Sequence, residues 1–373
     1  MITKRTIQEN IEKSLFKGKV IIIYGARQVG KTTLVKEILK NYPDESGYYN
    51  CDEIDIRQAL IDKTSTELKA FFGNKKLAVL DEAQRIKNIG LTLKLIVDNF
   101  PDLQIIATGS SSFDLSNEIA EPLTGRKIEF YLFPFSLEEI GGVYSNLELS
   151  RLLERRIIYG MYPEIVLNEG DAERNLKNLT SSYTYKDILQ YQRIKNPEIL
   201  EKLLQTLALQ IGNEVSYNEL ASLVGADKKT ISNYIQILEK AFIVFRLRPF
   251  SRNLRNELKR MRKIYFYDTG IRNVLINNLN PMEIRQDVGN LWENFIISEK
   301  IKKNSNLNIS KNVYFWRNRQ GQEIDYLEEG NGKLEGFEIK WKEDKFKKPK
   351  IFLENYSNSS VGLINKENFR KFV

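Results

Sequence analysis

The chain has 373 residues, of which 42% are apolar and 28% charged, enough for two or three folded domains. It has no histidine, which excludes Ser-His-Asp triads and histidine-ligated zinc, and its single cysteine, Cys51, excludes an internal disulfide. No apolar run approaches the about 20 residues of a membrane span, and the N-terminus has no apolar signal core, so we expect a cytoplasmic protein without a membrane partner.

The net charge of +8 is uneven along the chain. Residues 241–373 hold 26 Lys and Arg against 16 Asp and Glu, whereas residues 1–240 hold 31 against 33. This asymmetry favours a polyanionic partner for the last third, although a solvated lysine-rich surface is the alternative.

Residues 20–33 read V-I-I-I-Y-G-A-R-Q-V-G-K-T-T, and a helical pattern continues to residue 40. A buried strand, a glycine-bounded loop and a helix start are typical of a phosphate-binding loop. We expect Lys31 between the β- and γ-phosphates of ATP and the Thr32 hydroxyl on Mg²⁺. The expected nucleotide-binding residues are Gly25, Ala26, Arg27, Gln28, Val29, Gly30, Lys31, Thr32 and Thr33.

A second apolar run, at residues 77–80, shows no alternation, as expected of a parallel strand buried on both faces, and ends in Asp81 and Glu82. We expect Asp81 to contact Mg²⁺ and Glu82 to polarise the attacking water, which predicts an NTP hydrolase. An acidic helix start after a strand is the alternative.

Polar residues follow a third strand, at 103–107, where it reaches the carboxyl edge of the sheet. Thr108 and Ser110 are candidates for contact with the γ-phosphate or the water, and a Ser/Gly turn is the alternative. Arg126, before a strand at 128–132, is a candidate for transition-state stabilisation, within its own subunit or as a finger into a neighbour. A solvent-facing arginine is equally compatible with its position.

We expect four segments: a P-loop ATPase domain at 1–145, a helical lid or linker at 146–197, a winged helix-turn-helix at 198–252 and a C-terminal α/β domain at 253–373. Helix, glycine turn, helix and strands follow one another at 198–250, the order of a winged helix. Its third helix presents Lys228 and Lys229 to a phosphate backbone, unless the module serves as a lid or oligomer contact.

A basic run with interleaved aromatic residues comes next and is the strongest nucleic-acid signal in the chain. A disordered basic loop is the alternative. Its candidates for binding nucleic acid are Arg246, Arg248, Arg252, Arg255, Arg260 and Arg262, and Lys259 and Lys263 belong to the same run.

The last domain carries a possible second Mg²⁺ centre in its sequence pattern: Glu293 in a helix, Asp325 in a strand, and Glu338 and Lys340 on one face of the next strand. Carboxylates around a lysine can hold Mg²⁺ for phosphodiester cleavage. A surface strand with alternating charges is the alternative.

Nine short stretches carry a resemblance that spans nearly the whole chain. They are Y-G-A-R-Q-V-G-K-T-T at 24–33, L-D-E-A-Q at 80–84, T-G-S at 108–110, G-R at 125–126, Y-G-M-Y-P at 159–163, Y-D-T-G at 267–270, L-W-E-N at 291–294, E-I-D at 323–325 and E-I-K at 338–340. In these the chain resembles a large prokaryotic family of AAA+-type ATPases with a winged helix and a C-terminal PD-(D/E)XK nuclease-like domain.

The resemblance implies ATP hydrolysis with Mg²⁺ and assembly into a homo-oligomer, as a dimer or a hexameric ring. Two positions depart from the family pattern. Ile324 stands where the nuclease motif has proline, and Met161 replaces the second glycine of Gly-Gly-Tyr-Pro, which questions a backbone role of that site.

The sequence thus predicts an α/β, Mg²⁺-dependent ATPase that acts on DNA by translocation, remodelling of branched structures or regulated cleavage. Two alternatives stay open at this point. One is a signalling NTPase switch that controls a protein partner, and the other is an ATP-gated, Mg²⁺-dependent DNA endonuclease.

Overall fold

The computed structural model describes residues 3–109, 119, 121–181, 194, 196–252, 261–343 and 345–373. The chain divides into two compact units. The first comprises Met1–Pro134, Lys240–Phe242 and Ser305–Asn308, and the second comprises Phe135–Glu239, Ile243–Asn304 and Ile309–Val373. Within the described residues, no helix combines the length and the apolar character needed to cross a membrane.

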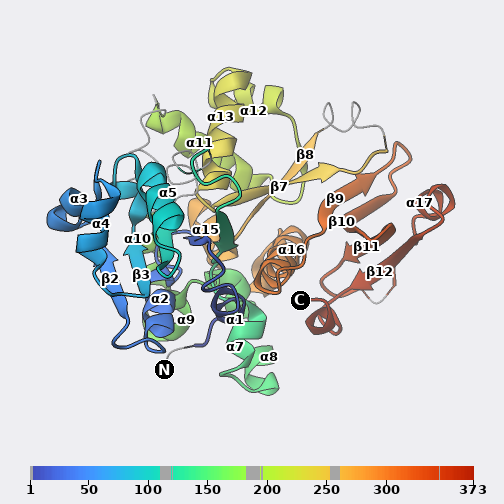
Figure 1. The fold of residues 1–373 in the computed structure, drawn as a ribbon. Helices are drawn as coiled ribbons and strands as arrows, with labels where there is room; N and C mark the ends of the chain where they lie inside the picture. The colour runs from blue at the N-terminus through green and yellow to red at the C-terminus, as the bar shows by residue number, and fades with distance from the viewer. Residues whose placement is uncertain are drawn as a thin grey trace. The chain divides into compact units, whose positions relative to one another are not determined.

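The first unit is built on a parallel sheet of five strands in the order β2-β3-β4-β1-β5. Two neighbouring strands of this sheet, β2 and β3, are labelled in Figure 1. Every residue of β1, β3 and β4 is buried, which explains why these segments are apolar without alternation. The strands are β1 Val20–Tyr24, β2 Ser46–Asn50, β3 Leu77–Asp81, β4 Gln104–Gly109 and β5 Lys127–Tyr131. The helices are α1 Gln8–Glu12, α2 Lys31–Leu39, α3 Ile54–Leu60, α4 Ser65–Phe72 and α5 Ile89–Asn99.

The predicted parallel α/β fold of this unit is confirmed. Because parallel strands end at the same edge of a sheet, the residues that follow β1, β3 and β4 gather at one edge. The phosphate-loop sequence follows β1, and the acid pair is at the end of β3. The topology therefore assembles the predicted nucleotide site from separate parts of the chain.

The second unit contains a mixed sheet in the order β12-β11-β10-β9-β7-β8-β6. Its strands are β6 Glu214–Val215, β7 Val244–Pro249, β8 Arg262–Phe266, β9 Asn312–Arg317, β10 Glu323–Gly330, β11 Lys333–Ile339 and β12 Ser359–Ile364. Its helices include α7 Leu137–Gly141, α8 Asn146–Tyr159, α9 Pro163–Leu167, α10 Ala172–Ser181, α11 Pro197–Leu209, α12 Tyr217–Val224, α13 Lys228–Lys240, α15 Thr269–Leu275, α16 Val288–Asn306 and α17 Lys350–Asn355.

One continuous sheet crosses the predicted boundary at residue 252. The strands β7 and β8 pair antiparallel on either side of that residue, and β7 also pairs parallel with β9. The predicted winged-helix and C-terminal segments therefore share a sheet. The expected order of helix, glycine turn and helix is present as α12, Gly225 and α13, whereas its assignment as a winged helix stays a prediction.

Two of the short motifs meet inside the second unit. The Asp268 carboxylate caps α15 and accepts hydrogen bonds from the backbone N–H groups of Ile271, at 3.1 Å, and Met161, at 2.7 Å. Burial raises the pKa of Asp268 above its ordinary value. Since this contact uses the backbone N–H of residue 161 and not its side chain, methionine in place of glycine preserves it.

The position of the Asp268 carboxylate also explains why residue 160 is glycine. Gly160 has φ +81°, and a Cβ there would lie 2.0 Å from Oδ1 of Asp268. A side chain at residue 160 would thus be strained by its backbone conformation and would also displace the carboxylate.

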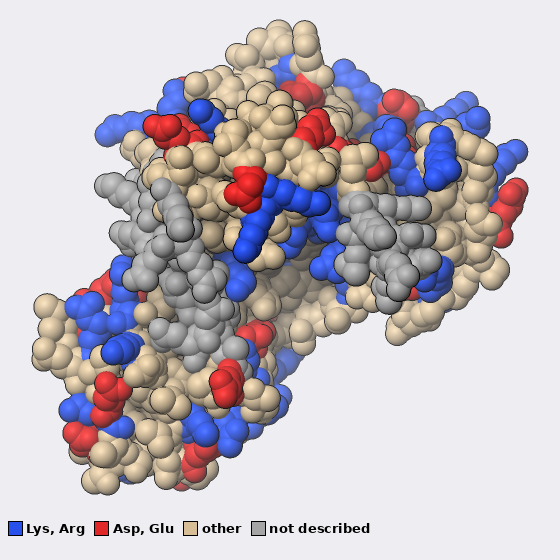
Figure 2. Space-filling model, turned by 90° about the horizontal axis from the view of Figure 1, so that it is seen from above, with Lys and Arg blue, Asp and Glu red and all other residues tan. Residues whose placement is uncertain are grey.

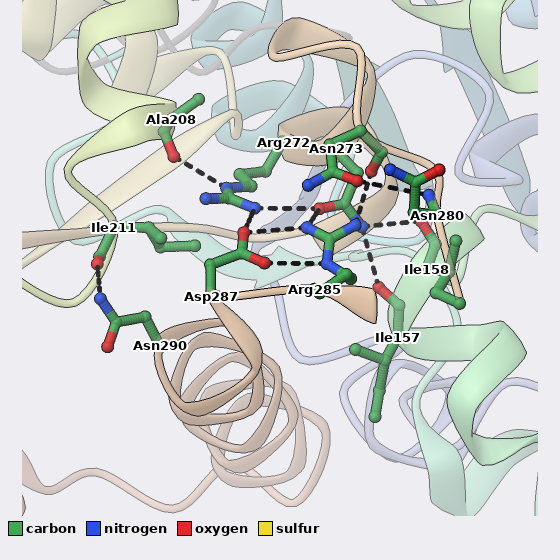
Figure 3. Close-up of polar contacts among 11 residues, drawn as sticks. Ile157, Ile158, Ala208, Ile211, Arg272, Asn273, Asn280, Arg285, Asp287 and Asn290 are labelled. Atoms are coloured by element: carbon green, nitrogen blue, oxygen red, sulfur yellow. Dashed lines mark hydrogen bonds and ion pairs between the residues drawn. The ribbon is translucent and has the colours of Figure 1, made fainter. Parts of the chain in front are cut away.

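A buried polar network holds four helices of this unit together (Figure 3). Arg285 Nε donates to Asp287 at 2.9 Å, and Arg272 also pairs with Asp287. Arg272 Nε donates to a carbonyl of α11 at 2.8 Å, and Asn273 Nδ2 donates to a carbonyl of α8 at 2.8 Å. These side chains connect α15 and the start of α16 to α8 and α11, a structural role that the sequence pattern did not reveal.

We predict that Gly160→Ala lowers the free energy of unfolding by about 2–4 kcal/mol, because the new Cβ meets the Asp268 carboxylate. The matched control is Gly332→Ala, where φ is +73° but nothing lies within 4 Å of an added Cβ. That control should cost about 1 kcal/mol, from the backbone conformation alone. Urea unfolding measures both, and equal costs would contradict the close contact.

Candidate nucleotide-binding site

The loop between β1 and α2 has the backbone of a phosphate cradle. Gln28 and Gly30 adopt positive φ, of 60° and 95°, so the chain turns sharply before α2 begins at Lys31. Gly25 passes so close to the segment after β5 that a Cβ would lie 2.3 Å from the carbonyl oxygen of Leu132. Glycine at residue 25 therefore permits close packing, and glycine at residue 30 permits the turn.

Lys31 lies buried over its own loop. Its Nζ donates to the carbonyl oxygens of Gly25 and Ala26, each at 2.9 Å. Arg5 holds the far side of the loop: its Nη1 donates to the carbonyl of Val29 at 2.7 Å and its Nη2 to that of Phe133 at 2.6 Å. Arg5 belongs to no recognisable motif, and its contact with the loop was missed in the sequence.

The Asp81 carboxylate, whose residue is 3% exposed, is the centre of the site. Its Oδ2 accepts hydrogen bonds from Thr32 Oγ1 at 2.7 Å and from the Tyr48 hydroxyl at 2.5 Å. Its Oδ1 accepts a hydrogen bond from Thr108 Oγ1. Hydroxyl and carboxylate oxygens are the hard donors that Mg²⁺ prefers, so the residues present fit this ion.

Thr108 also reaches the second acid. Its Oγ1 accepts a hydrogen bond from the backbone N–H of Glu82 at 3.1 Å. Of the two candidates at this strand end, Thr108 therefore lies on the acid pair, whereas Ser110 falls outside the described residues.

Glu82 has an uncommon backbone for a residue other than glycine, with φ 55° and ψ 43°. Its Oε2 accepts a hydrogen bond from Gln84 Nε2 at 2.5 Å. Such conformations cost of order 1–3 kcal/mol and often occur at functional sites. This outlier supports the hypothesis that Glu82 has a chemical role.

Arg126 lies at the other edge of the sheet. It directly precedes β5, whose first residue pairs with Val20 at the start of β1, and its Nε pairs with Asp98 at 2.7 Å. The phosphate loop begins beyond the far end of these five-residue strands, about 16 Å away at about 3.3 Å per residue. Arg126 thus lies away from the phosphate loop of its own subunit in this structure, and its role in transition-state stabilisation stays a prediction.

The candidates for nucleic-acid binding have different environments. Lys228 and Lys229 are exposed at the start of α13, and Arg248 is exposed in β7. By contrast, Arg246 pairs with Glu239 and donates to the Tyr217 hydroxyl at 2.8 Å. The protein itself therefore engages part of the basic run.

Two further candidates contact aromatic rings of their own unit. The guanidinium of Arg252 pairs with Glu329 at 3.2 Å and lies 5.5 Å from the ring centre of Phe250, and that of Arg262 lies 5.0 Å from the ring centre of Tyr217. Arg255 and Arg260 fall outside the described residues. On the face drawn in Figure 2, Lys and Arg side chains are interspersed with Asp and Glu.

The remaining member of the run, Lys263, is not a surface residue. It is 2% exposed, and its Nζ lies 3.1 Å from Glu293 Oε1, 2.6 Å from Glu323 Oε1 and 3.4 Å from Asp325 Oδ1. The expectation that Lys263 faces a polyanion is wrong, because its buried ammonium group forms ion pairs with three carboxylates of its own unit.

Lys263 also lies among the acids of the predicted nuclease-like cluster. Glu293 and Asp325 do come together, and Lys340 pairs with Glu338 at 2.9 Å beside them. In the part of the chain that the structure describes, no group of three or more metal-ligating side chains is arranged to hold an ion. The cluster is an ion-pair network in this structure.

Burial is the main cause, and the neighbouring Asp325 carboxylate the second, of a pKa of about 7 for Glu293. The Tyr265 hydroxyl donates to Glu293 Oε1. Glu323, Tyr265 and Lys263 were all missed as members of this cluster in the sequence, because their roles depend on strand pairing and not on spacing.

A lysine and a threonine at the start of a helix, beside a buried aspartate on a parallel strand, define the first unit as a P-loop NTPase domain. Residues 17–141 match the family model described as "AAA domain", so this stretch is similar to AAA-type domains. Residues 150–282 and 288–370 match two further models, each described as a domain of unknown function.

Curated relatives match along most of the chain. An uncharacterized protein of Methanocaldococcus jannaschii is 27% identical in an alignment of 350 residues that covers 88% of this chain and 76% of the relative. An uncharacterized protein of Mycobacterium tuberculosis is 26% identical in an alignment of 344 residues that covers 91% of this chain and 74% of the relative.

Among solved structures, the Walker-type ATPase of Pyrococcus abyssi is similar with a TM-score of 0.50 and 19% identity. The match covers 74% of this chain and 96% of that protein. At this identity the likeness concerns the fold, and it agrees with the P-loop architecture of the first unit.

We predict that stability falls as pH rises from about 5 to 7 through Glu293, by roughly 3 kcal/mol at most. A carboxyl with a raised pKa keeps its proton in the folded state over this range, whereas the unfolded chain has already released it. Glu293→Gln should make the measured slope shallower by this amount, as followed by urea unfolding at several pH values. Glu354→Gln, at an exposed position of the same unit, is the control, and a slope that is the same in Glu293→Gln as in the wild type would contradict the assignment.

Proposed function

We propose that this protein is an ATP hydrolase that requires Mg²⁺. The observation that carries the proposal is the convergence of Lys31, Thr32, Asp81 and Glu82 at one edge of a parallel sheet. The loop N–H groups and the start of α2 would hold the phosphates, and Lys31 would exchange its loop carbonyls for phosphate oxygens. Thr32 and Asp81 would hold Mg²⁺, which when bound neutralises charge on the phosphates.

Hydrolysis follows from the second acid. The oxygen of a water attacks the γ-phosphorus, and the bond from that phosphorus to the bridging oxygen breaks, leaving ADP and phosphate. Glu82 orients this water and accepts its proton. Thr108 would fix the positions of the two acids relative to each other, because its hydroxyl donates a hydrogen bond to Asp81 and accepts one from the backbone N–H of Glu82.

The proposed polymer partner is DNA, on which ATP hydrolysis would drive remodelling or translocation. The supporting observation is the polar surface of α13, where Lys228, Lys229, Asn233 and Gln236 are exposed after a helix-turn-helix connection. Assembly into a homo-oligomer is part of this proposal, since Arg126 lies away from the phosphate loop of its own subunit. The signalling-switch alternative predicts instead an ATPase rate that is indifferent to DNA.

Nuclease activity is not part of the proposal. The carboxylates that would hold its metal are paired with Lys263 and Lys340.

We predict that Glu82→Gln lowers the ATPase kcat by about 10²–10⁴-fold while the protein still binds ATP, because only the acceptor for the water's proton is lost. Lys31→Ala should instead weaken nucleotide binding. Phosphate release and binding of a fluorescent ATP analogue separate these effects. Glu53→Gln, an exposed acid near the same edge, is the control, and an active Glu82→Gln enzyme would refute the role.

We predict that duplex DNA stimulates the ATPase and that the double variant Lys228→Ala/Lys229→Ala weakens DNA binding, with a salt slope shallower by about 2. The matched control is Lys347→Ala/Lys348→Ala, which removes the same charge from another exposed adjacent pair. Fluorescence anisotropy at several salt concentrations measures binding. Equal losses in both double variants would argue against α13 as the DNA surface, and no DNA binding at all would remove DNA from the proposal.

A further inference from the structure

Tyr48 is a third hydroxyl group in the nucleotide site, and it belongs to no known motif of the sequence. It lies in β2, next to β3, and its hydroxyl donates to Asp81 Oδ2 at 2.5 Å. The same oxygen accepts the hydrogen bond from Thr32 Oγ1 at 2.7 Å. We propose that Tyr48 is a positioning residue that orients the Asp81 carboxylate for divalent-cation binding; this inference rests on the proposed ATPase function.

The argument begins with the rotation of the carboxylate. Thr108 restrains Oδ1, but a carboxylate held at one oxygen can still swing the other. Tyr48 approaches Oδ2 from the neighbouring strand, while Thr32 approaches it from α2. With donors from three elements, Asp81 is held with Oδ2 beside the threonine hydroxyl that would bind the metal.

The ring of Tyr48 is itself fixed against α2. Lys36 Nζ lies 4.7 Å from the ring centre, a cation–π contact. Lys36 follows Thr32 by four residues, so the two side chains share one face of α2. The ring and the hydroxyl of Tyr48 thus contact the same helix face that presents the metal-binding threonine.

The chain offers a matched control in the next residue. Successive strand side chains point to opposite faces of a sheet, and Tyr49 packs on Phe71 and Phe72 at centroid distances of 5.0 and 5.5 Å. Tyr49→Phe and Tyr48→Phe each remove one phenol oxygen from adjacent half-buried positions, but only Tyr48 contacts Asp81.

The experiment measures metal binding and not only activity. A fluorescent ATP analogue is titrated into the full chain with excess EDTA and at increasing Mg²⁺, and Mn²⁺ binding in the presence of ADP is followed by electron paramagnetic resonance. We expect Tyr48→Phe to raise the half-saturating Mg²⁺ and Mn²⁺ concentrations about tenfold with unchanged nucleotide affinity in EDTA. Tyr49→Phe should behave as the wild type.

Each other outcome decides against the inference. Wild-type metal affinity in Tyr48→Phe overturns the role of Tyr48 and leaves the ATPase proposal standing. Weaker nucleotide binding by Tyr48→Phe in EDTA as well assigns Tyr48 to the general structure of the site instead. A wild-type chain that binds no nucleotide under any condition refutes the proposed function, and the role of Tyr48 with it.

Discussion

The nucleotide site of the first unit depends on the hydrogen bonds that the buried Asp81 carboxylate accepts. Asp81 ends a fully buried strand, where an unpaired charge would cost several kcal/mol, and hydroxyl groups from α2, β2 and β4 donate to it. These donors come from three different elements, so the carboxylate connects the helix of the phosphate loop to two strands of the sheet. Stability and function coincide here, because the contacts that solvate the buried charge also place it beside Thr32.

The second unit solves the problem of buried charge differently. Asp268 is satisfied by backbone N–H groups, Asp287 by two arginines, and the acids around Lys263 by its ammonium group. Breaking such a group by removing one partner costs about 3–5 kcal/mol, because the other charge remains buried. Charged residues that look like surface or ligand-binding positions in the sequence therefore hold this unit together.

The sequence predicts those features that depend on local order along the chain. The apolar runs before Gly25 and Asp81 identify buried parallel strands, and the spacing from Gly25 to Thr32 identifies the loop, because each pattern is read within one segment. Tyr48, Arg5 and Lys263 could not be assigned in this way. Each gains its role from a partner 24 to 62 residues away, and only strand pairing and packing select that partner.

The basic run is a second case in which the sequence pattern alone does not identify the partner of each charged residue. Its composition predicts a polyanion surface, but composition does not reveal which cations the protein engages itself. Arg246 and Lys263 are paired with acids of their own unit, whereas Arg248 stays exposed in the same stretch. Arg246 and Arg248 lie two residues apart on β7 and so point to the same face of the sheet, which means that the pairing of Arg246 with Glu239 depends on packing and not on strand alternation.

The contrast between the two acid clusters shows what distinguishes a cation site from an ion-pair network. Both contain carboxylates at strand positions, and both look like Mg²⁺ centres in the sequence. The hydroxyls of Thr32, Tyr48 and Thr108 stabilise the Asp81 carboxylate but do not neutralise it, so its charge remains available to a cation. Lys263 supplies a full positive charge among Glu293, Glu323 and Asp325, and an incoming Mg²⁺ would have to compete with that ammonium group. The nature of the donor, neutral hydroxyl or ammonium, thus favours metal binding in the first unit and opposes it in the second.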